Sequence, residues 1–406
     1  MSWLQNLVGG GKPKPEKFGE IVHKHLKQQG VEGRLVYDPQ GFAINVVAED
    51  GSVKQNYFLQ NAYDDYCRVP AGDRQKVLDG YFAAAPEMPA LLKDAITQVM
   101  PRVQMRSFFE QIALQQRLGA MQALGDMIAH EVMAEHFAKA LIFDSPKHVS
   151  YISESKLTGW ETSFGELFER ALVNLARVTP EPLQRAADGV YYSHYSDTHD
   201  ATRLLLKDRI SECRVKGRPV AVMPNRNRLF VVGEDDVAAQ EKVIAMTEKS
   251  LQEESRPMPV FPLVFDGGTW QLWTAPEGTG VSTQWKRLHA MAMGEEYSAQ
   301  KGLLDQIHQK EGKDIFVANY MAYQNQEGHI MSAATLTQGV ATLLPKADRV
   351  CFVVPEGNPE TVMCPWDEAV SVIGQHMKPV EGYPQRWFVD YFPNAEEMNR
   401  IREKSS

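Results

Sequence analysis

Two histidines and two glutamates lie within seven residues in the segment HEVMAEH, residues 130–136. A helical zinc site of the metalloprotease type needs two histidines four residues apart, because that spacing places both imidazoles on one helix face. Here His130 and His136 are six residues apart, which separates them by roughly 120° around a helix. We therefore interpret the segment as part of an amphipathic helix over residues 107–142 and not as a metal site.

A second group of possible metal ligands lies in YSHYSDTHDA, residues 192–201. Imidazole and carboxylate groups of this kind can bind zinc or manganese. The segment also leads from a predicted strand into a predicted helix, where Asp197 or Thr198 would serve as an N-cap and Asp200 would suit the first turn. We favour capping. The alternative is a metal site formed by His194, His199 and Asp200.

A third candidate is FDSPKHVSYISESK, residues 143–156. An Asp on one strand followed by Glu-x-Lys on the next is typical of restriction-like nuclease cores, in which carboxylates hold magnesium and the lysine stabilises charge. Asp144, Glu154 and Lys156 are the residues in those positions. No upstream acidic partner is evident, so the sequence favours solvated strand ends over a catalytic site.

One stretch is strongly basic although the whole chain is acidic. Residues 203–228 contain eight Lys or Arg and only Asp208 and Glu212 as acids, a net charge of +6 in a chain of −9. Such a face can bind phosphate, nucleic acid or an acidic protein, whereas the alternative is a solvated helix end with charges guarding a strand edge. The residues we expect to contact an anionic ligand are Lys216, Arg218, Arg226 and Arg228.

Composition limits the remaining possibilities. The chain has 406 residues, of which 43% are hydrophobic and 23% charged, as in ordinary globular proteins of two or three domains. The net charge of −9 argues against a chain built to coat nucleic acid or an anionic membrane. Its four cysteines form no C-x-x-C pair, and no apolar run approaches the ~18 residues of a membrane span. We expect a cytoplasmic protein with reduced thiols and no cofactor.

The order of the predicted elements favours an α+β fold of hairpin-rich mixed sheets packed by helices, in two domains. Strands arrive mainly as hairpins, with turn signals at residues 224–227 and 266–268, and not in regular βαβ alternation. A helix over 162–178 has Thr162 or Ser163 as its cap and Glu166 in its first turn. The predicted boundaries are a tail at 1–15, an α+β region at 16–275 with a possible split near 100, a linker at 276–286 and a C-terminal domain at 287–400.

Several segments together resemble a known family. LIFDSPKHVSYISESKLTGWETSFGELFERALVNL, then HDATRLLL, then GRPVAVMPNRNRLFVVGEDD follow the order of motifs in the YtpQ-like family of bacterial proteins of unknown function. The resemblance covers roughly residues 16–275 and implies a bacterial cytoplasmic protein without assigned catalytic residues. Arg226 matches the Arg of the family's PnRd motif, and the family pattern has Asp144 without a Glu-x-Lys partner.

Two functional hypotheses follow from these residues. The first is a non-enzymatic binding or regulatory protein that presents the basic face at 203–228 to an anionic ligand or an acidic protein partner. The alternative is a metal-dependent hydrolase or nuclease that uses either the Asp144 group or the His194 group.

Overall fold

The protein is described here from a computed structural model, which places residues 12–39, 41–49, 53–82, 88–118, 127–145, 148–186, 189–254, 257–325, 328–357 and 359–405. Helices, antiparallel sheets and mixed sheets make up this part of the chain, so the predicted α+β class is confirmed. No helix within these ranges combines the length and apolarity needed to cross a membrane. The apolar residues of the predicted tail, 3–8, lie outside the described residues.

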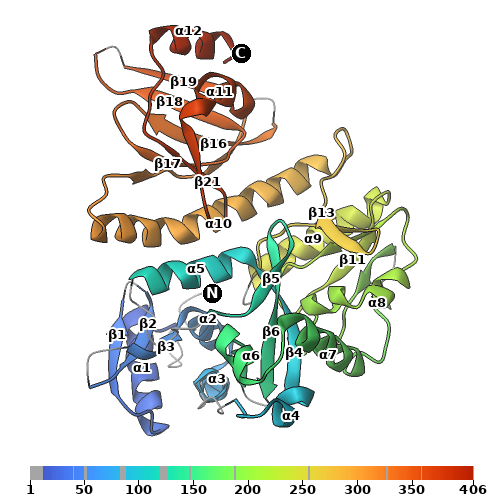
Figure 1. The fold of residues 1–406 in the computed structure, drawn as a ribbon. Coiled ribbons are helices and arrows are strands. Elements are labelled where there is room, and N and C mark those ends of the chain that lie inside the picture. The colour runs from blue at the N-terminus through green and yellow to red at the C-terminus, as the bar shows by residue number, and fades with distance from the viewer. Residues whose placement is uncertain are drawn as a thin grey trace, which may run out of the picture.

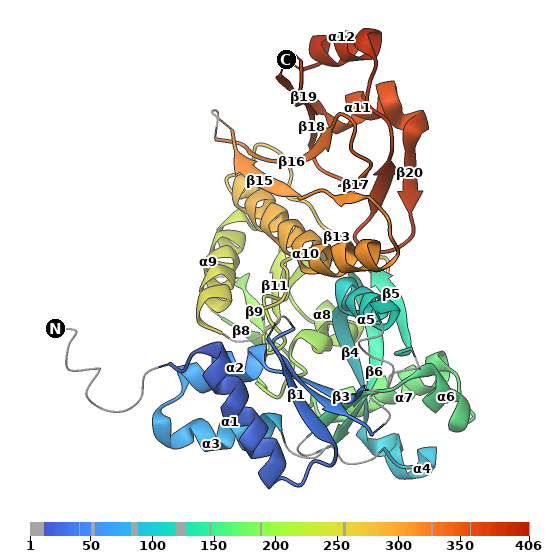
Figure 2. The same ribbon diagram turned by 90° about the vertical axis from the view of Figure 1, so that its left-hand side faces the viewer.

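The N-terminal unit packs helices against a three-stranded antiparallel meander (Figure 2). The apolar face of the first helix is buried: Phe18, Val22 and Leu26 belong to one core cluster with Ile44 of the sheet. The segment that follows the meander forms only short helices. The elements are α1 (Pro15–Gln28), β1 (Arg34–Asp38), β2 (Ala43–Val47), β3 (Val53–Phe58), α2 (Gln60–Arg68), α3 (Arg74–Tyr81) and α4 (Leu92–Ala95).

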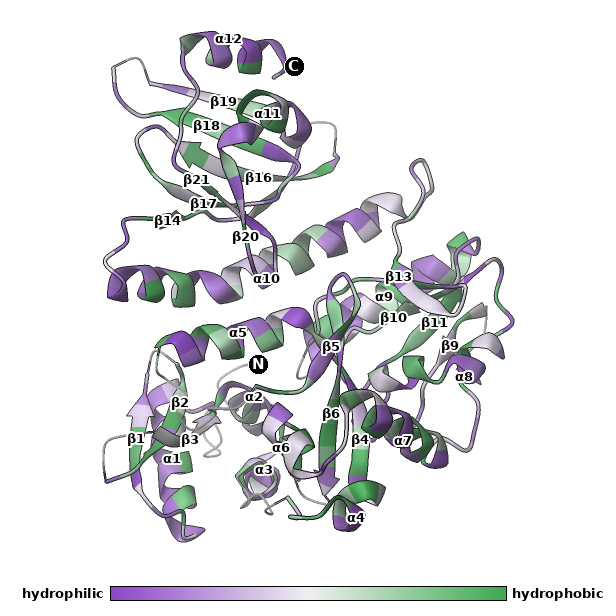
Figure 3. Ribbon diagram, viewed as in Figure 1, coloured by the Kyte–Doolittle hydropathy of each residue, from purple (hydrophilic) through white to green (hydrophobic). Residues whose placement is uncertain are grey.

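A second sheet contains the segment for which the sequence prediction was wrong. The helix expected over 107–142 ends at Leu118, and HEVMAEH forms a strand and the turn after it. The following apolar run enters the centre of the sheet, where a strand buried on both faces has the same unbroken pattern as a buried helix. Figure 3 shows this strand, β6, as strongly hydrophobic. The elements are β4 (Val99–Met105), α5 (Arg106–Leu118), β5 (His130–Ala134), β6 (Phe137–Ser145), β7 (His148–Tyr151), α6 (Glu154–Gly159) and α7 (Phe164–Arg177).

The start of α7 is as predicted. Ser163 accepts from the backbone N–H of Glu166, and the Glu166 side chain accepts in return from the backbone of Ser163. This capping box satisfies two N–H groups that the helix cannot pair internally.

The third sheet has six strands in the order β13-β12-β10-β11-β9-β8. Its hairpins β10–β11 and β12–β13 confirm the predicted turns at 224–227 and 266–268. The helix expected over 198–215 is interrupted, because Leu206 has non-helical backbone angles between two short helices. The elements are β8 (Gln184–Arg185), β9 (Tyr191–Tyr192), a 3-10 turn (Ala201–Leu205), α8 (Lys207–Ser211), β10 (Pro219–Val222), β11 (Phe230–Gly233), α9 (Val237–Glu253), β12 (Leu263–Asp266) and β13 (Thr269–Leu272).

A 29-residue helix, α10 (Ser282–Lys310), joins these sheets to the C-terminal region. In Figure 1 it runs between α5 below and the C-terminal strands above, and it contacts both α5 and β16. Residues 282–286 of the predicted linker are its first turn, and the division into two domains stays a prediction. The other elements are β14 (Phe316–Val317), β15 (Met321–Gln324), β16 (Ile330–Thr337), β17 (Thr342–Pro345), β18 (Arg349–Val354), β19 (Glu360–Pro365), α11 (Trp366–Ile373), β20 (Met377–Val380), β21 (Arg386–Val389) and α12 (Ala395–Glu403).

Candidate functional site

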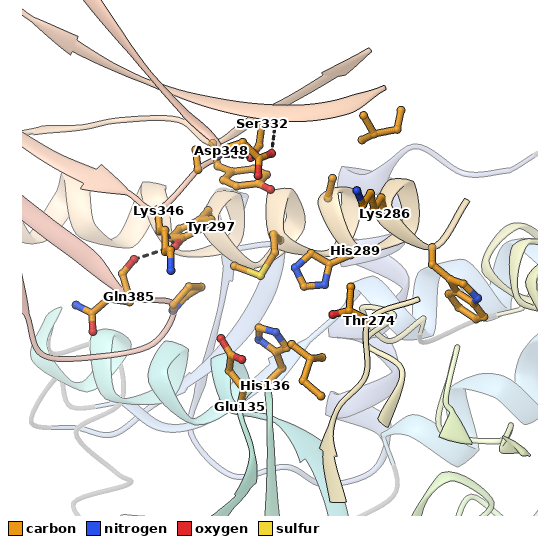
Figure 4. Close-up of a pocket in the computed structure, with 18 of the residues that line it drawn as sticks. Glu135, His136, Thr274, Lys286, His289, Tyr297, Ser332, Lys346, Asp348 and Gln385 are labelled. Atoms are coloured by element: carbon orange, nitrogen blue, oxygen red, sulfur yellow. Dashed lines mark hydrogen bonds between the residues drawn. The ribbon is translucent and has the colours of Figure 1, made fainter. Parts of the chain in front are cut away.

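A cavity of about 580 Å³ lies along α10, between the β5–β6 turn on one side and the C-terminal strands on the other (Figure 4). Residues from distant parts of the chain line it. The β5–β6 turn contributes Glu135 and His136, and the segment after β13 contributes Trp273 and Thr274. From α10 come Trp285, Lys286, His289, Met293 and Tyr297, and from the C-terminal region Tyr320, Ser332, Lys346, Asp348, Tyr383 and Gln385.

Helical spacing explains why α10 forms one wall of the cavity. Trp285, His289, Met293 and Tyr297 are each four residues apart, so their side chains fall on one face of the helix. The opposite wall is fixed by α5, because the Arg106 backbone N–H donates to the carbonyl of His136 and its guanidinium donates to the carbonyl of Glu135, both at 3.0 Å.

His136 is the most deeply buried polar side chain in this wall, with 3% of its surface exposed. Its ring stacks on Phe261 with centroids 3.8 Å apart, and Nδ1 lies 2.7 Å from the hydroxyl oxygen of Tyr383. Burial, and then the nearby His289 and Arg106, lower the pKa of His136 to about 3, so the ring is neutral near pH 7. Nε2 has no hydrogen-bond partner among the described residues.

His289 lies beside His136, with ring centroids 5.8 Å apart. Burial lowers its pKa, and the negative charges of Glu135 and Asp348 oppose that effect only in part. The cavity therefore contains two neutral imidazoles at physiological pH.

Charged groups enter the cavity from opposite sides (Figure 4). The Asp348 carboxylate already accepts two hydrogen bonds, from the backbone N–H and from the hydroxyl of Ser332, both at 2.7 Å. Lys286 pairs with Glu277 outside the cavity at 3.0 Å. The Lys346 ammonium, in contrast, forms no ion pair with any carboxylate in the described part of the chain.

Tyr297 fixes the C-terminal wall against α10. Its hydroxyl donates to the carbonyl of Gln385 at 2.8 Å and accepts from the backbone N–H of Lys346 at 3.2 Å. The Arg386 guanidinium lies over its ring, 4.7 Å from the centroid, and donates to its carbonyl. These contacts determine where Lys346 and the residues around Tyr383 enter the cavity.

Asp144 from the nuclease hypothesis and His199 from the metal-site hypothesis lie next to each other, away from the cavity. Asp144 accepts a hydrogen bond from Nε2 of the buried His199 at 2.8 Å, which ties the end of β6 to the segment before the 3-10 turn. Glu154 and Lys156 lie in α6, not on a strand as predicted, and the Lys156 ammonium reaches the carbonyl of Met88. The nuclease arrangement is therefore not formed.

The possible metal ligands at 192–201 take part in a buried hydrogen-bond network. Ser193 donates to Asp200 at 2.5 Å, and Asp197 accepts from the guanidinium of Arg203, which has no exposed surface. Asp197 also accepts from the backbone N–H of His199, two residues on. The capping prediction is wrong in its residues, because the 3-10 turn begins at Ala201 with Asp200 at its N-cap position and without a side-chain cap hydrogen bond. His194 stacks on Tyr195. No group of three His, Cys, Asp or Glu side chains anywhere in the described ranges is placed to hold a metal ion.

Intramolecular carboxylates pair with the basic stretch. Arg218 contacts Glu234 and Asp266, both at 2.7 Å. Lys216 pairs with Asp236 at 3.0 Å, and Arg228 pairs with Glu254 at 2.9 Å. The carbonyl of Arg226 accepts from the backbone N–H of Ala201, and Arg226 makes a further interaction. The net charge of +6 counted along residues 203–228 is thus largely compensated by acids that follow that window in the sequence.

No protein-family model, no curated protein and no solved structure matches this chain. The YtpQ-like resemblance therefore stays a prediction.

Sequence reasoning missed the cavity. HEVMAEH drew attention to His136 only as a possible metal ligand, and neither Tyr383 nor Lys346 stood out. The four-residue spacing from Trp285 to Tyr297 is the one local signal that could have indicated a helix face of mixed aromatic and polar groups.

Proposed function

We propose that this protein is a binding protein that holds a small organic anion in the cavity beside α10. The volume of about 580 Å³ falls within the range of typical small-molecule sites, roughly 300–1,000 Å³. Its lining combines aromatic rings with a few polar groups, which is the usual composition of such sites.

The main observation behind the proposal is that Nε2 of the buried His136 has no hydrogen-bond partner within the described ranges. A buried polar atom without a partner costs free energy, about 1–3 kcal/mol, and a ligand that bonds to Nε2 recovers it. Lys346 favours a negatively charged ligand. Its ammonium can pair with an anion without breaking an existing ion pair with a carboxylate of the protein.

The walls of the cavity also suit a regulatory role. Because the walls come from the β5–β6 turn, the segment after β13, α10 and the C-terminal region, a bound molecule adds contacts between parts of the chain that are far apart in sequence. A ligand that binds only the assembled cavity stabilises that arrangement by mass action.

The test uses anilinonaphthalene sulfonate, an aromatic anion whose fluorescence rises on binding. We expect saturable binding of one molecule per chain. Lys346→Met should weaken binding by about tenfold, since a contact with a charged group contributes about 1.5 kcal/mol. Lys378→Met, which removes an exposed lysine of β20, is the matched control and should leave the affinity unchanged.

A second variant tests the place of binding independently of charge. Ala290→Phe fills the cavity from α10, so the probe should no longer bind at one site per chain. Binding that is unchanged by both Lys346→Met and Ala290→Phe would show that the probe lies elsewhere, and the proposal would be wrong.

A further inference from the structure

The cavity contains charges of both signs on different walls. Lys346 enters it from the C-terminal region, and Glu135 enters it from the β5–β6 turn (Figure 4). The Glu135 carboxylate forms neither a hydrogen bond nor an ion pair with any group in the described part of the chain. A ligand therefore meets one cation and one anion that are both available for pairing, and Lys346 alone accounts only for the acid group of the ligand.

The positive groups close to Glu135 are directed elsewhere. The Arg106 guanidinium donates to the backbone carbonyl of Glu135 at 3.0 Å and lies 4.6 Å from the centre of the Tyr383 ring. His136 and His289 carry no charge near pH 7, because burial lowers the pKa of both rings. Among the described residues, no cation contacts the Glu135 carboxylate and balances its charge.

Asp348 is the second acid of the cavity, and it is the less suitable partner for a cation. Both of its hydrogen bonds, from the backbone and the hydroxyl of Ser332, reach the same oxygen, Oδ2, and hold the side chain against the C-terminal wall. Lys346 lies on that wall only two positions earlier in the sequence. A positively charged group beside Asp348 would therefore be repelled by Lys346, whereas Glu135 lies on the other wall.

Aromatic rings of the lining add a further attraction for a cation. Trp273 and Trp285 pack edge to face with their ring centroids 6.0 Å apart. Tyr320, from the C-terminal region, stacks on Tyr297 with centroids 5.3 Å apart. The faces of aromatic rings attract ammonium groups electrostatically, so the rings and the Glu135 carboxylate favour the same kind of group.

We infer that the ligand is a zwitterion, an organic acid that also carries an ammonium group, and that Glu135 is the residue that selects for the ammonium group. The inference rests on the proposed function for the acid group at Lys346 and adds the second charge. An acid without an ammonium group would leave the Glu135 carboxylate unpaired and would be repelled by it. Aminocarboxylates with an aromatic body are the class that satisfies both charges and the rings.

Competition with anilinonaphthalene sulfonate, the probe of the proposed function, tests for the second charge. Two pairs of compounds differ only in having an ammonium or a methyl group at one position. They are phenylalanine with 2-methyl-3-phenylpropionate, and 4-(aminomethyl)benzoate with 4-ethylbenzoate. The first pair tests charges close together, and the second tests charges at opposite ends of a ring. In at least one pair, the ammonium compound should displace the probe at about fivefold lower concentration, the upper value for an ion pair of an accessible carboxylate.

Glu135→Gln should abolish this preference, because the amide keeps the shape of the side chain and removes its charge. The matched control is Glu131→Gln. Glu131 belongs to β5, does not line the cavity, and pairs with Lys139 at 2.8 Å, so its replacement should leave the preference unchanged. Methyl compounds that bind as well as the ammonium compounds in both pairs, or a preference that persists in Glu135→Gln, would overturn the inference.

The same experiment separates this inference from the proposed function. If the probe binds in the cavity but none of the four compounds displaces it, or the ammonium group brings no advantage, the anion site stands and the selection by Glu135 is wrong. If the probe does not bind, or binds equally well to Ala290→Phe and Lys346→Met, the proposed function is wrong and the inference is overturned with it.

Discussion

Replacing Glu296 by Gln should change how stability depends on pH. Burial raises the pKa of Glu296 from an ordinary 4.5 to about 7 in the folded chain. Below pH 4.5 the carboxyl is protonated in both the folded and the unfolded states and costs nothing. As pH rises from 4.5 to 7, the carboxyl ionises in the unfolded state but stays protonated in the folded state, so stability is lost until the pH passes 7. The shift corresponds to about 3 kcal/mol above pH 7.

Glu296→Gln removes that ionisation and keeps the size of the side chain and an acceptor oxygen. The variant should therefore match the unmodified chain at pH 4.5 and exceed it at pH 8.5. At roughly 2–4 °C per kcal/mol, the midpoint of thermal unfolding should rise by about 6–12 °C at pH 8.5. Differential scanning calorimetry at both pH values measures the difference.

The control is Asp305→Asn, which removes an exposed carboxylate from the same helix and should follow the pH dependence of the unmodified chain. An equal difference between Glu296→Gln and the unmodified chain at pH 4.5 and pH 8.5 would refute the reasoning, because the effect would then not come from ionisation.

Three further predictions concern single side chains. The pKa of His136 is lowered to about 3 in the folded chain, so the free energy of unfolding should fall as the pH drops below 6.5, by about 3 kcal/mol at pH 4.5. His136→Gln should reduce this pH dependence, as measured by thermal unfolding. Ser163→Ala removes the capping box of α7 and should lower the unfolding free energy by about 1 kcal/mol in urea titration. Asp144→Ala leaves the buried His199 without its acceptor and should cost about 1–3 kcal/mol by the same titration, whereas Asp144→Asn keeps an acceptor and should cost less.

The elements predicted best are those with local signals. The cap and apolar face of α7 and the hairpin turns at 224–227 and 266–268 were readable because they depend on residues a few positions apart. The segment 130–142 was mistaken for a helix because its apolar residues show no period that separates a helix from a strand, and only the pairing of β4, β5 and β6 settles the matter. The strand that was expected to carry Asp144 is confirmed, as the end of β6.

The candidate site could not be predicted because its contacts join distant parts of the chain. His136 and Tyr383 are 247 positions apart, and Asp144 and His199, assigned to separate hypotheses, are 55 apart. The basic face looked unpaired for the same reason: the acids that pair with Arg218 follow it by 16 and 48 positions. Counting charges within a window cannot detect such partners.

The most direct test of the central claim is a crystal structure of the protein soaked with anilinonaphthalene sulfonate. The account predicts electron density for the probe inside the cavity along α10, with the sulfonate beside Lys346 and a polar group of the probe within hydrogen-bond distance of Nε2 of His136. A cavity closed by its own side chains, with the probe bound only on the outer surface, would contradict it.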